Sequence, residues 1–200
     1  MKFLRTFYFG TLVTVSLLQF GCASNTKVRP ANFINQALNV QQIGTIYMMP
    51  MVDGRLDKKQ KVDFKYIDLV IGNTGNEYLK PRNYTYKHIK NRALVSDLNK
   101  DDLTSPNVDR LRQINLPGAR WLLFFVLDDA YVKAGLDTTH NAEVTMLLLD
   151  RDEGQLLLKH KEISQIRAGI LTAPLQSWQR LPIIYAFCDC LEAIPIRAKQ

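Results

Sequence analysis

Two groups of acidic residues are the most obvious candidates for chemistry. Asp128 and Asp129 are adjacent, as a catalytic pair of carboxylates could be, but neighbouring strand residues point to opposite faces and would not converge. Asp150, Asp152 and Glu153 could bind a hard cation such as Ca²⁺, yet the segment lacks the ligand spacing of a calcium loop. Aspartate and glycine also favour a hairpin turn for backbone reasons. We therefore expect a turn here and no metal site.

The cysteine and histidine side chains form no familiar catalytic pattern. Cys188 and Cys190 are two positions apart, and on a helix such side chains diverge by about 200°, so we expect that they are not joined to each other. His88, His140 and His160 lie in separate segments without paired ligand spacing. The chain has no Gly-x-Ser-x-Gly elbow and no glycine loop for phosphate. We expect no cofactor and no enzymatic activity.

A basic and aromatic segment, residues 80–92, is the best candidate for a binding surface. An alternating strand here would present Tyr84, Tyr86 and His88 on one face, and the charged side chains would add little to stability. Such a mixture suits an anionic partner. The alternative is a solvated edge strand whose lysines oppose aggregation between sheets. The candidate partner-binding residues are Lys80, Arg82, Tyr84, Tyr86, Lys87, Lys90 and Arg92.

The N-terminus has the three-part layout of an export signal. Lys2 and Arg5 precede an apolar stretch over residues 7–18, and small residues follow it. A membrane-spanning helix needs about 20 apolar residues, so this stretch is too short to be one. We expect residues 1–21 to be a signal peptide.

The end of this stretch suggests lipidation. Gly21-Cys22 resembles the lipobox of bacterial lipoproteins, in which the cysteine is acylated and becomes the new N-terminus, although Gln19 stands where leucine is usual. The alternative is ordinary cleavage after Ala23, which would discard Cys22. The resemblance implies that Cys22 anchors the protein in a membrane, and Ala23 after it implies the outer membrane.

Composition and charge favour one globular domain with an anionic partner. The chain has 200 residues, of which 46% are hydrophobic and 22% charged. Its formal charge is +7, and removing Lys2 and Arg5 leaves 24 basic and 19 acidic side chains, or +5. This excess suits anionic lipid, glycan or an acidic protein face. It is too diffuse to indicate nucleic acid, which we do not expect as a partner.

Hydrophobic patterns divide the rest of the chain into a tether and a domain. Residues 22–42 are polar and contain Pro30, so we expect a lipidated N-terminus and tether, with at most a short helix over 33–38. The globular domain should cover residues 43–200, beginning with a strand over 43–50.

Further elements follow in a regular order. Apolar residues at helical spacing predict a helix over 67–79, and a strand is expected at 84–89. Ser105-Pro106 should begin a second helix, and three strands should follow over 121–132, 141–149 and 155–163. A last helix should have Pro182 in its first turn. The sequence thus predicts an α/β fold (an α+β sandwich) with a mixed sheet of about five strands and about three helices, in the order β-α-β-α-β-β-β-α.

Three short phrases carry a resemblance to known families. They are Ile43-Gly44-Thr45-Ile46, the Leu-Pro-Gly-Ala-Arg-Trp-Leu-Leu of residues 116–123, and the Leu-Leu-Asp-Arg-Asp-Glu-Gly-Gln of residues 148–155. Together with the element order, they resemble the α/β domain of the TolB N-terminal domain, LpoB and CsgG families. That resemblance implies a bacterial outer-membrane lipoprotein facing the periplasm.

These observations lead to two functional hypotheses. The first is a non-catalytic outer-membrane lipoprotein that binds another component of the cell envelope, an envelope protein or peptidoglycan, as a regulator or assembly factor. The second is a structural subunit of a secretion, pilus or flagellar machine, which would work by self-association as a homo-oligomer. A large homomeric ring, measured by native mass, would favour the second.

Lipidation of Cys22 is directly testable. Replacing this residue in Cys22→Ala removes the thiol that would be acylated, so labelling by a fatty-acid probe should disappear and the protein should leave the membrane fraction. Unchanged labelling of the variant would contradict the assignment.

Overall fold

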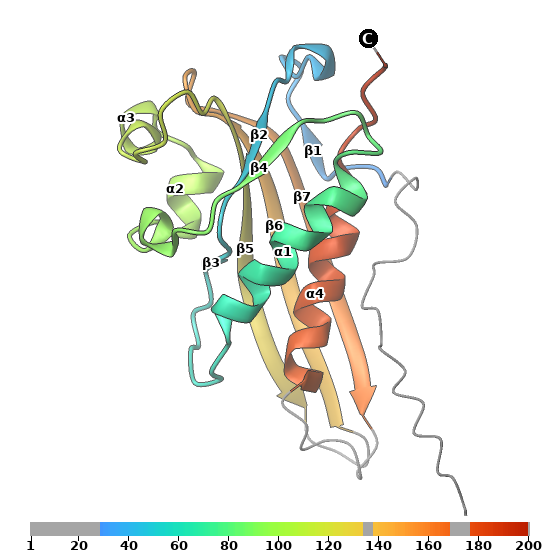
Figure 1. The fold of residues 1–200 in the computed structure, drawn as a ribbon. Helices are drawn as coiled ribbons and strands as arrows, with labels where there is room; N and C mark the ends of the chain where they lie inside the picture. Colours follow the sequence, from blue (N-terminus) through green and yellow to red (C-terminus); the bar gives the residue numbers. More distant parts are fainter. Residues whose placement is uncertain (1–28, 134–137, 169–176, 200) are drawn as a thin grey trace, which may run out of the picture.

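A mixed β-sheet forms the centre of this computed structural model, which describes residues 29–133, 138–168 and 177–199 (Figure 1). Its seven strands are β1 (Phe33–Ile34), β2 (Ile46–Met48), β3 (Val52–Asp53), β4 (Tyr86–His88), β5 (Trp121–Lys133), β6 (Thr138–Asp150) and β7 (Gln155–Ala168). The strand order is β1-β7-β6-β5-β2-β4, with β3 paired to β5. The predicted α+β class and the mixed sheet are therefore confirmed.

The helices lie on both faces of this sheet. They are α1 (Phe64–Tyr78), α2 (Lys100–Thr104), α3 (Val108–Arg112) and α4 (Ser177–Leu191), with short 3₁₀ turns η1 (Val40–Gln42) and η2 (Arg92–Val95). One apolar core lies between the sheet and α1 and α4, and a second lies between the opposite face and η2, α2 and α3. No helix within the described ranges is long and apolar enough to cross a membrane.

The three long strands form an antiparallel meander, as the apolar runs predicted. β5 pairs with β6, and β6 pairs with β7. The Asp150 carboxylate accepts hydrogen bonds from the backbone N–H groups of Asp152 and Glu153, and Gly154 has a φ of +63° that suits glycine. These acidic residues therefore form a turn, as expected.

The other half of the sheet is parallel. β2 lies between β4 and β5 and runs parallel to both. The carboxyl ends of β2 and β4 therefore meet at one edge of the sheet, since Met48 is in register with His88. This is the arrangement that creates ligand crevices in open α/β sheets.

Helix α1 approaches β2 and β4 closely because glycine faces them. The Asp63 side chain caps α1 by accepting a hydrogen bond from the N–H of Tyr66. A Cβ atom added to Gly75 would lie 2.8 Å from Met48 Sδ and 2.7 Å from Tyr86 Cε2. The helix could not pack at this distance if alanine stood there.

The N-terminal boundary differs from the prediction. Phe33 and Ile34 form a strand on β7, not part of a helix over 33–38. Arg29 makes ion pairs with Glu162, Asp189 and Glu192, at 3.0, 3.2 and 2.7 Å. These contacts show that residues 29–42 belong to the fold and not to a tether. The sequence did not reveal this, because a strand of two residues is too short to show a hydrophobic period. The predicted signal peptide, 1–21, and Cys22 lie outside the described residues.

Two helix starts also differ. Asn107, not Ser105, caps α3 by accepting from the N–H groups of Asp109 and Arg110. Pro182 was expected in the first turn of the last helix. It lies inside α4 instead, because α4 begins at Ser177, five residues before the proline. A short helix, α2, was not predicted, although Asn99 caps it.

The close packing of α1 predicts the effect of Gly75→Ala. Alanine favours a helix by about 1 kcal/mol over glycine, but overpacking against Met48 and Tyr86 costs about 1–3 kcal/mol. We expect net destabilisation, measured as a lower urea midpoint by circular dichroism. Asn73→Ala, at an exposed position of the same helix, is the matched control and should be neutral or slightly stabilising. Stabilisation by Gly75→Ala would contradict the packing.

Candidate functional site

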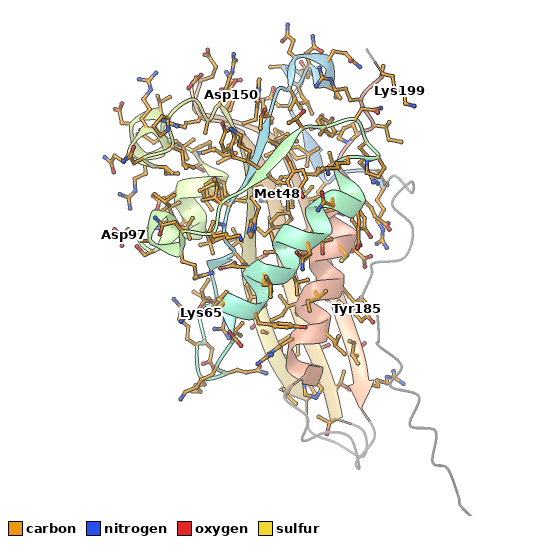
Figure 2. All side chains as sticks on the ribbon, in the orientation of Figure 1. Met48, Lys65, Asp97, Asp150, Tyr185 and Lys199 are labelled. Atoms are coloured by element: carbon orange, nitrogen blue, oxygen red, sulfur yellow. The ribbon has the colours of Figure 1, made fainter. Side chains whose placement is uncertain are left out.

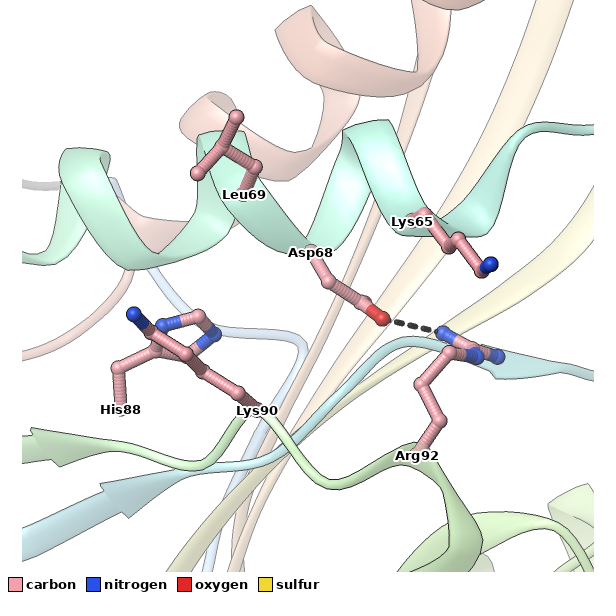
Figure 3. A pocket seen from close by; sticks show the side chains of 6 residues that line it. All are labelled: Lys65, Asp68, Leu69, His88, Lys90 and Arg92. Carbon is pink, nitrogen blue, oxygen red and sulfur yellow. Dashed lines mark hydrogen bonds and ion pairs between the residues drawn. The ribbon is translucent and has the colours of Figure 1, made fainter.

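A pocket of about 420 Å³ opens where the carboxyl ends of β2 and β4 meet the first turns of α1. Figure 3 shows its lining: Asp68 of α1 points toward Arg92, and His88 and Lys90 lie across from the helix, at the end of β4 and just after it. The lining residues are Lys65, Asp68, Leu69, His88, Lys90 and Arg92. This is the position at which open α/β sheets bind ligands.

One buried carboxylate holds the pocket together. Asp68 is 6% exposed, and its Oδ1 accepts a hydrogen bond of 3.0 Å from the N–H of Met51. Its Oδ2 forms an ion pair of 2.6 Å with Arg92 Nη1, and Arg92 Nη2 donates to the Met51 carbonyl at 3.0 Å. These bonds join α1 to the segments that follow β2 and β4 (Figure 3). Charge-assisted bonds of this kind fix geometry strongly.

An aromatic ring supports the guanidinium. Arg92 lies over the Phe64 ring, with 4.7 Å between its Cζ and the ring centroid. Arg55 contacts the same ring at 5.9 Å and binds Asp53 through two hydrogen bonds of 2.8 and 3.0 Å. The Arg92 guanidinium is therefore fixed by Asp68, by the Met51 carbonyl and by the Phe64 ring.

The two lysines of the pocket are available to a ligand. Lys65 and Lys90 are both exposed, and neither forms an ion pair with another residue of the described ranges. Only Asp68 offsets them, and it is already bound to Arg92. The lining of the pocket therefore carries more positive than negative side chains, which favours anionic groups.

The His88 ring forms a neutral wall of this pocket. Burial lowers the pKa of His88 below its ordinary value, while Asp68 acts in the opposite direction and Lys90 adds to the lowering. A Cβ atom on Gly72 would come within 2.2 Å of Nδ1, so the ring packs directly on α1. At neutral pH the imidazole is uncharged and adds shape rather than charge.

The structure separates the predicted surface into several parts. Lys90 and Arg92 line the pocket, whereas exposed Lys80 follows the far end of α1. Lys87 is exposed and its Nζ lies 5.5 Å from the centroid of the Tyr47 ring. Tyr86 is half-buried against the core beneath α1.

Two of the predicted binding residues are buried, and their assignment to a surface was wrong. Arg82 is 0% exposed and donates to the carbonyls of Ile194, at 3.1 Å, and Tyr78, at 3.3 Å. Tyr84 is 3% exposed, and burial raises its pKa to about 12. The aromatic face of the segment was predicted correctly, but it points toward the core. Sequence alternation shows which residues share a face, not which face is solvated.

The structure gives Arg92 a larger expected role in stability than the sequence suggested. Its ion pair with Asp68 compensates a carboxylate that is almost fully buried. Removing one partner of such a pair leaves the other without compensation. Arg92 is therefore a structural residue of the pocket, and charge reversal there would place two carboxylates together.

The other acidic candidates are engaged in structural bonds. Asp128 pairs with Lys100 at 2.6 Å and accepts a hydrogen bond from Thr145, next to a register shift between Leu127 and Asp129. Asp150 pairs with Arg120 at 2.7 Å. Within the ranges that the structure describes, no group of three or more His, Cys, Asp or Glu side chains could hold a metal ion.

The prediction that Cys188 and Cys190 are not joined to each other is confirmed. Cys190 is a buried free thiol, so it is not joined to Cys188. Burial raises the pKa of the Cys190 thiol well above its ordinary value, which keeps the thiol protonated and unreactive.

Sequence reasoning missed three of the pocket's residues, all of them on α1. Asp68 and Leu69 lie within the predicted helix 67–79, whereas Lys65 lies before it, because α1 begins at Phe64. The one available signal was Asp68, an acidic residue directly after Ile67 on the buried side of α1. A carboxylate at such a position requires a partner, and that partner could not be identified from the sequence.

No protein-family model matches the chain, and no curated protein matches it. Solved structures with a related chain path include lipoprotein GNA1162 from Neisseria meningitidis, at 14% identity and a TM-score of 0.45, covering 63% of this chain and 85% of that one. The PelC dodecamer from Paraburkholderia phytofirmans has 13% identity and a TM-score of 0.44, covering 77% and 89%.

The C-terminal domain of LpoB from Salmonella enterica is also among them, at 10% identity and a TM-score of 0.35, covering 60% of this chain and 82% of that one.

The pocket geometry predicts different effects for its cations. Arg92→Gln leaves Asp68 with only the Met51 N–H, and because Arg92 is one-third exposed we expect a moderate loss of about 1–3 kcal/mol in unfolding free energy. Lys65→Ala and Lys90→Ala should change it by less than about 0.5 kcal/mol. Urea unfolding of the three variants measures this difference, and equal effects would contradict the assigned roles.

Proposed function

We propose that this protein is a non-catalytic outer-membrane lipoprotein that binds another component of the cell envelope, and that the pocket beside α1 receives an anionic group of that component. The main support is the pair of exposed lysines, Lys65 and Lys90, at a preformed cationic pocket. Arg92 is a third cation of the lining, held in place by Asp68 and Phe64, and since Asp68 balances its charge, the net positive charge of the pocket comes from the two lysines.

The arrangement suits binding rather than proton transfer. Asp68 is occupied by two donors and is nearly inaccessible, so it is poorly placed to act as a general base. His88 is packed on Gly72. The accessible groups of the pocket are ammonium groups, which attract and orient an anion.

Anchoring is the second part of the proposal. Lipidation of Cys22 would hold the domain at the periplasmic face of the outer membrane, where its pocket would meet partners by diffusion in two dimensions. The support for this part is the N-terminal sequence: a basic start, an apolar stretch over residues 7–18 and Gly21-Cys22.

Self-association as a structural subunit is the second candidate function. The observation that favours it is the edge of the sheet formed by β1 and β7, where Phe33 is 44%, Ile34 52% and Ile163 60% exposed. Apolar side chains on an edge strand favour pairing with another chain. Native mass measurement of the detergent-extracted protein separates the candidates, since this alternative requires a homomeric ring.

A charge reversal tests the proposed binding site. The variant Lys65→Glu/Lys90→Glu should remain folded, because both side chains are exposed, but should lose most of its capture of envelope components by co-purification. Capture should also weaken with salt, since exposed charges are screened over about 10 Å at 0.1 M.

The matched control is Lys80→Glu/Lys199→Glu, which changes the net charge equally at two exposed sites away from the pocket. Figure 2 shows Lys65 beside the start of α1 and Lys199 well away from it, near the top of the view. The control should capture the same components as the wild-type protein. If the control loses capture and the pocket variant keeps it, the site has been placed wrongly.

A further inference from the structure

Strand β4 is an open edge of the sheet, and its free backbone groups can be identified. It pairs with β2 on one side, and no strand of the described ranges pairs with its other side. The carbonyl of Thr85 accepts from the Ile46 N–H, and the Ile89 N–H donates to the Met48 carbonyl. Thr85 and Ile89 therefore face β2.

Alternate residues between Thr85 and Ile89 direct their backbone groups away from β2. Successive residues of a strand turn their N–H and C=O groups to opposite edges, so Tyr86 and His88 turn theirs away from β2. Among the residues that the structure describes, no hydrogen bond reaches these backbone groups. Two N–H and two C=O groups are thus available to an added strand.

The open edge leads directly into the cationic pocket. His88 is both the last residue of β4 and a wall of the pocket, and Lys90 and Arg92 follow within four residues. Lys65 reaches the same pocket from α1 (Figure 3). A chain that paired with β4 would therefore place a side chain near the two exposed lysines.

We propose that the protein binds an extended segment of a partner protein, which adds as a strand along the outer edge of β4 and places an acidic side chain in the pocket between Lys65 and Lys90. This inference rests on the proposed binding function and names its ligand class. Three features point to a peptide: the repeat of free backbone groups at Tyr86 and His88, the charge of the pocket, and the exposed apolar Leu69 at its rim.

The same geometry explains why the edge does not simply bind any strand. Lys87 is exposed on β4, and a lysine on an edge strand opposes pairing with neutral or basic chains. An acidic segment would instead be attracted by Lys87 and by the pocket. The edge is therefore selective for negative charge.

The test uses a library of random twelve-residue peptides displayed on phage and selected against the folded protein. We expect the selected peptides to share a Glu or Asp at one position within a strand-forming sequence. Binding of the best synthetic peptide, measured by fluorescence anisotropy, should weaken about tenfold or more in Lys65→Glu/Lys90→Glu and stay unchanged in Lys80→Glu/Lys199→Glu. Replacing its acidic residue by Gln or Asn should have a similar effect.

Amide hydrogen exchange supplies the readout that is specific for strand addition. The bound peptide should slow exchange at Tyr86 and His88, whose N–H groups would gain partners, while Lys87 already faces β2 and should change less. Selected peptides without a shared acidic residue, or unchanged exchange at both positions, would overturn the proposal. If the pocket variant loses envelope partners but no peptide is selected, the proposed function stands and the ligand is an anion of another class.

Discussion

The carboxylate of Asp68 connects three segments that are distant in sequence. It belongs to α1, binds the N–H of Met51 after β2, and pairs with Arg92 after β4. Burying this charge is acceptable only because both oxygens have donors. These bonds hold the first turns of α1 beside the ends of β2 and β4 and fix the orientation of Arg92.

The close contact of α1 with the parallel strands is the second constraint. Gly72 and Gly75 allow the His88 and Tyr86 rings to lie directly against the helix. The pocket therefore begins where these rings end, at the first turns of α1 and the carboxyl end of β4. The cations of the pocket have different roles. Arg92 is held in place and supports the structure, whereas Lys65 and Lys90 stay accessible to a ligand.

Long elements could be predicted from the sequence because their patterns repeat. The apolar strands β5, β6 and β7 and the helical period of α1 were recognisable, and so was the turn after Asp150. β1 and β3 have two residues each, which is too short for a period. They exist because β7 and β5 offer hydrogen-bonding edges, and this is a tertiary effect.

The site was only half predictable for a similar reason. The basic segment after β4 was identified, and it supplies Lys90 and Arg92. The sequence could not show that Arg82 and Tyr84 turn inward, because alternation does not say which face meets the core. Nor could it pair Asp68 with a residue 24 positions away. Pairing at that distance depends on how α1 packs on the sheet.

Binding of anionic partners at the pocket beside α1 can be observed directly by heteronuclear NMR of the isotope-labelled protein. Adding the component that co-purifies with it should shift the Arg92 side-chain Nε–Hε signal and the backbone amides from His88 to Arg92 most strongly, with little change at Phe33 and Ile34 on the opposite edge of the sheet. Shifts centred on Phe33, Ile34 and Ile163, with the signals from His88 to Arg92 unmoved, would contradict the account.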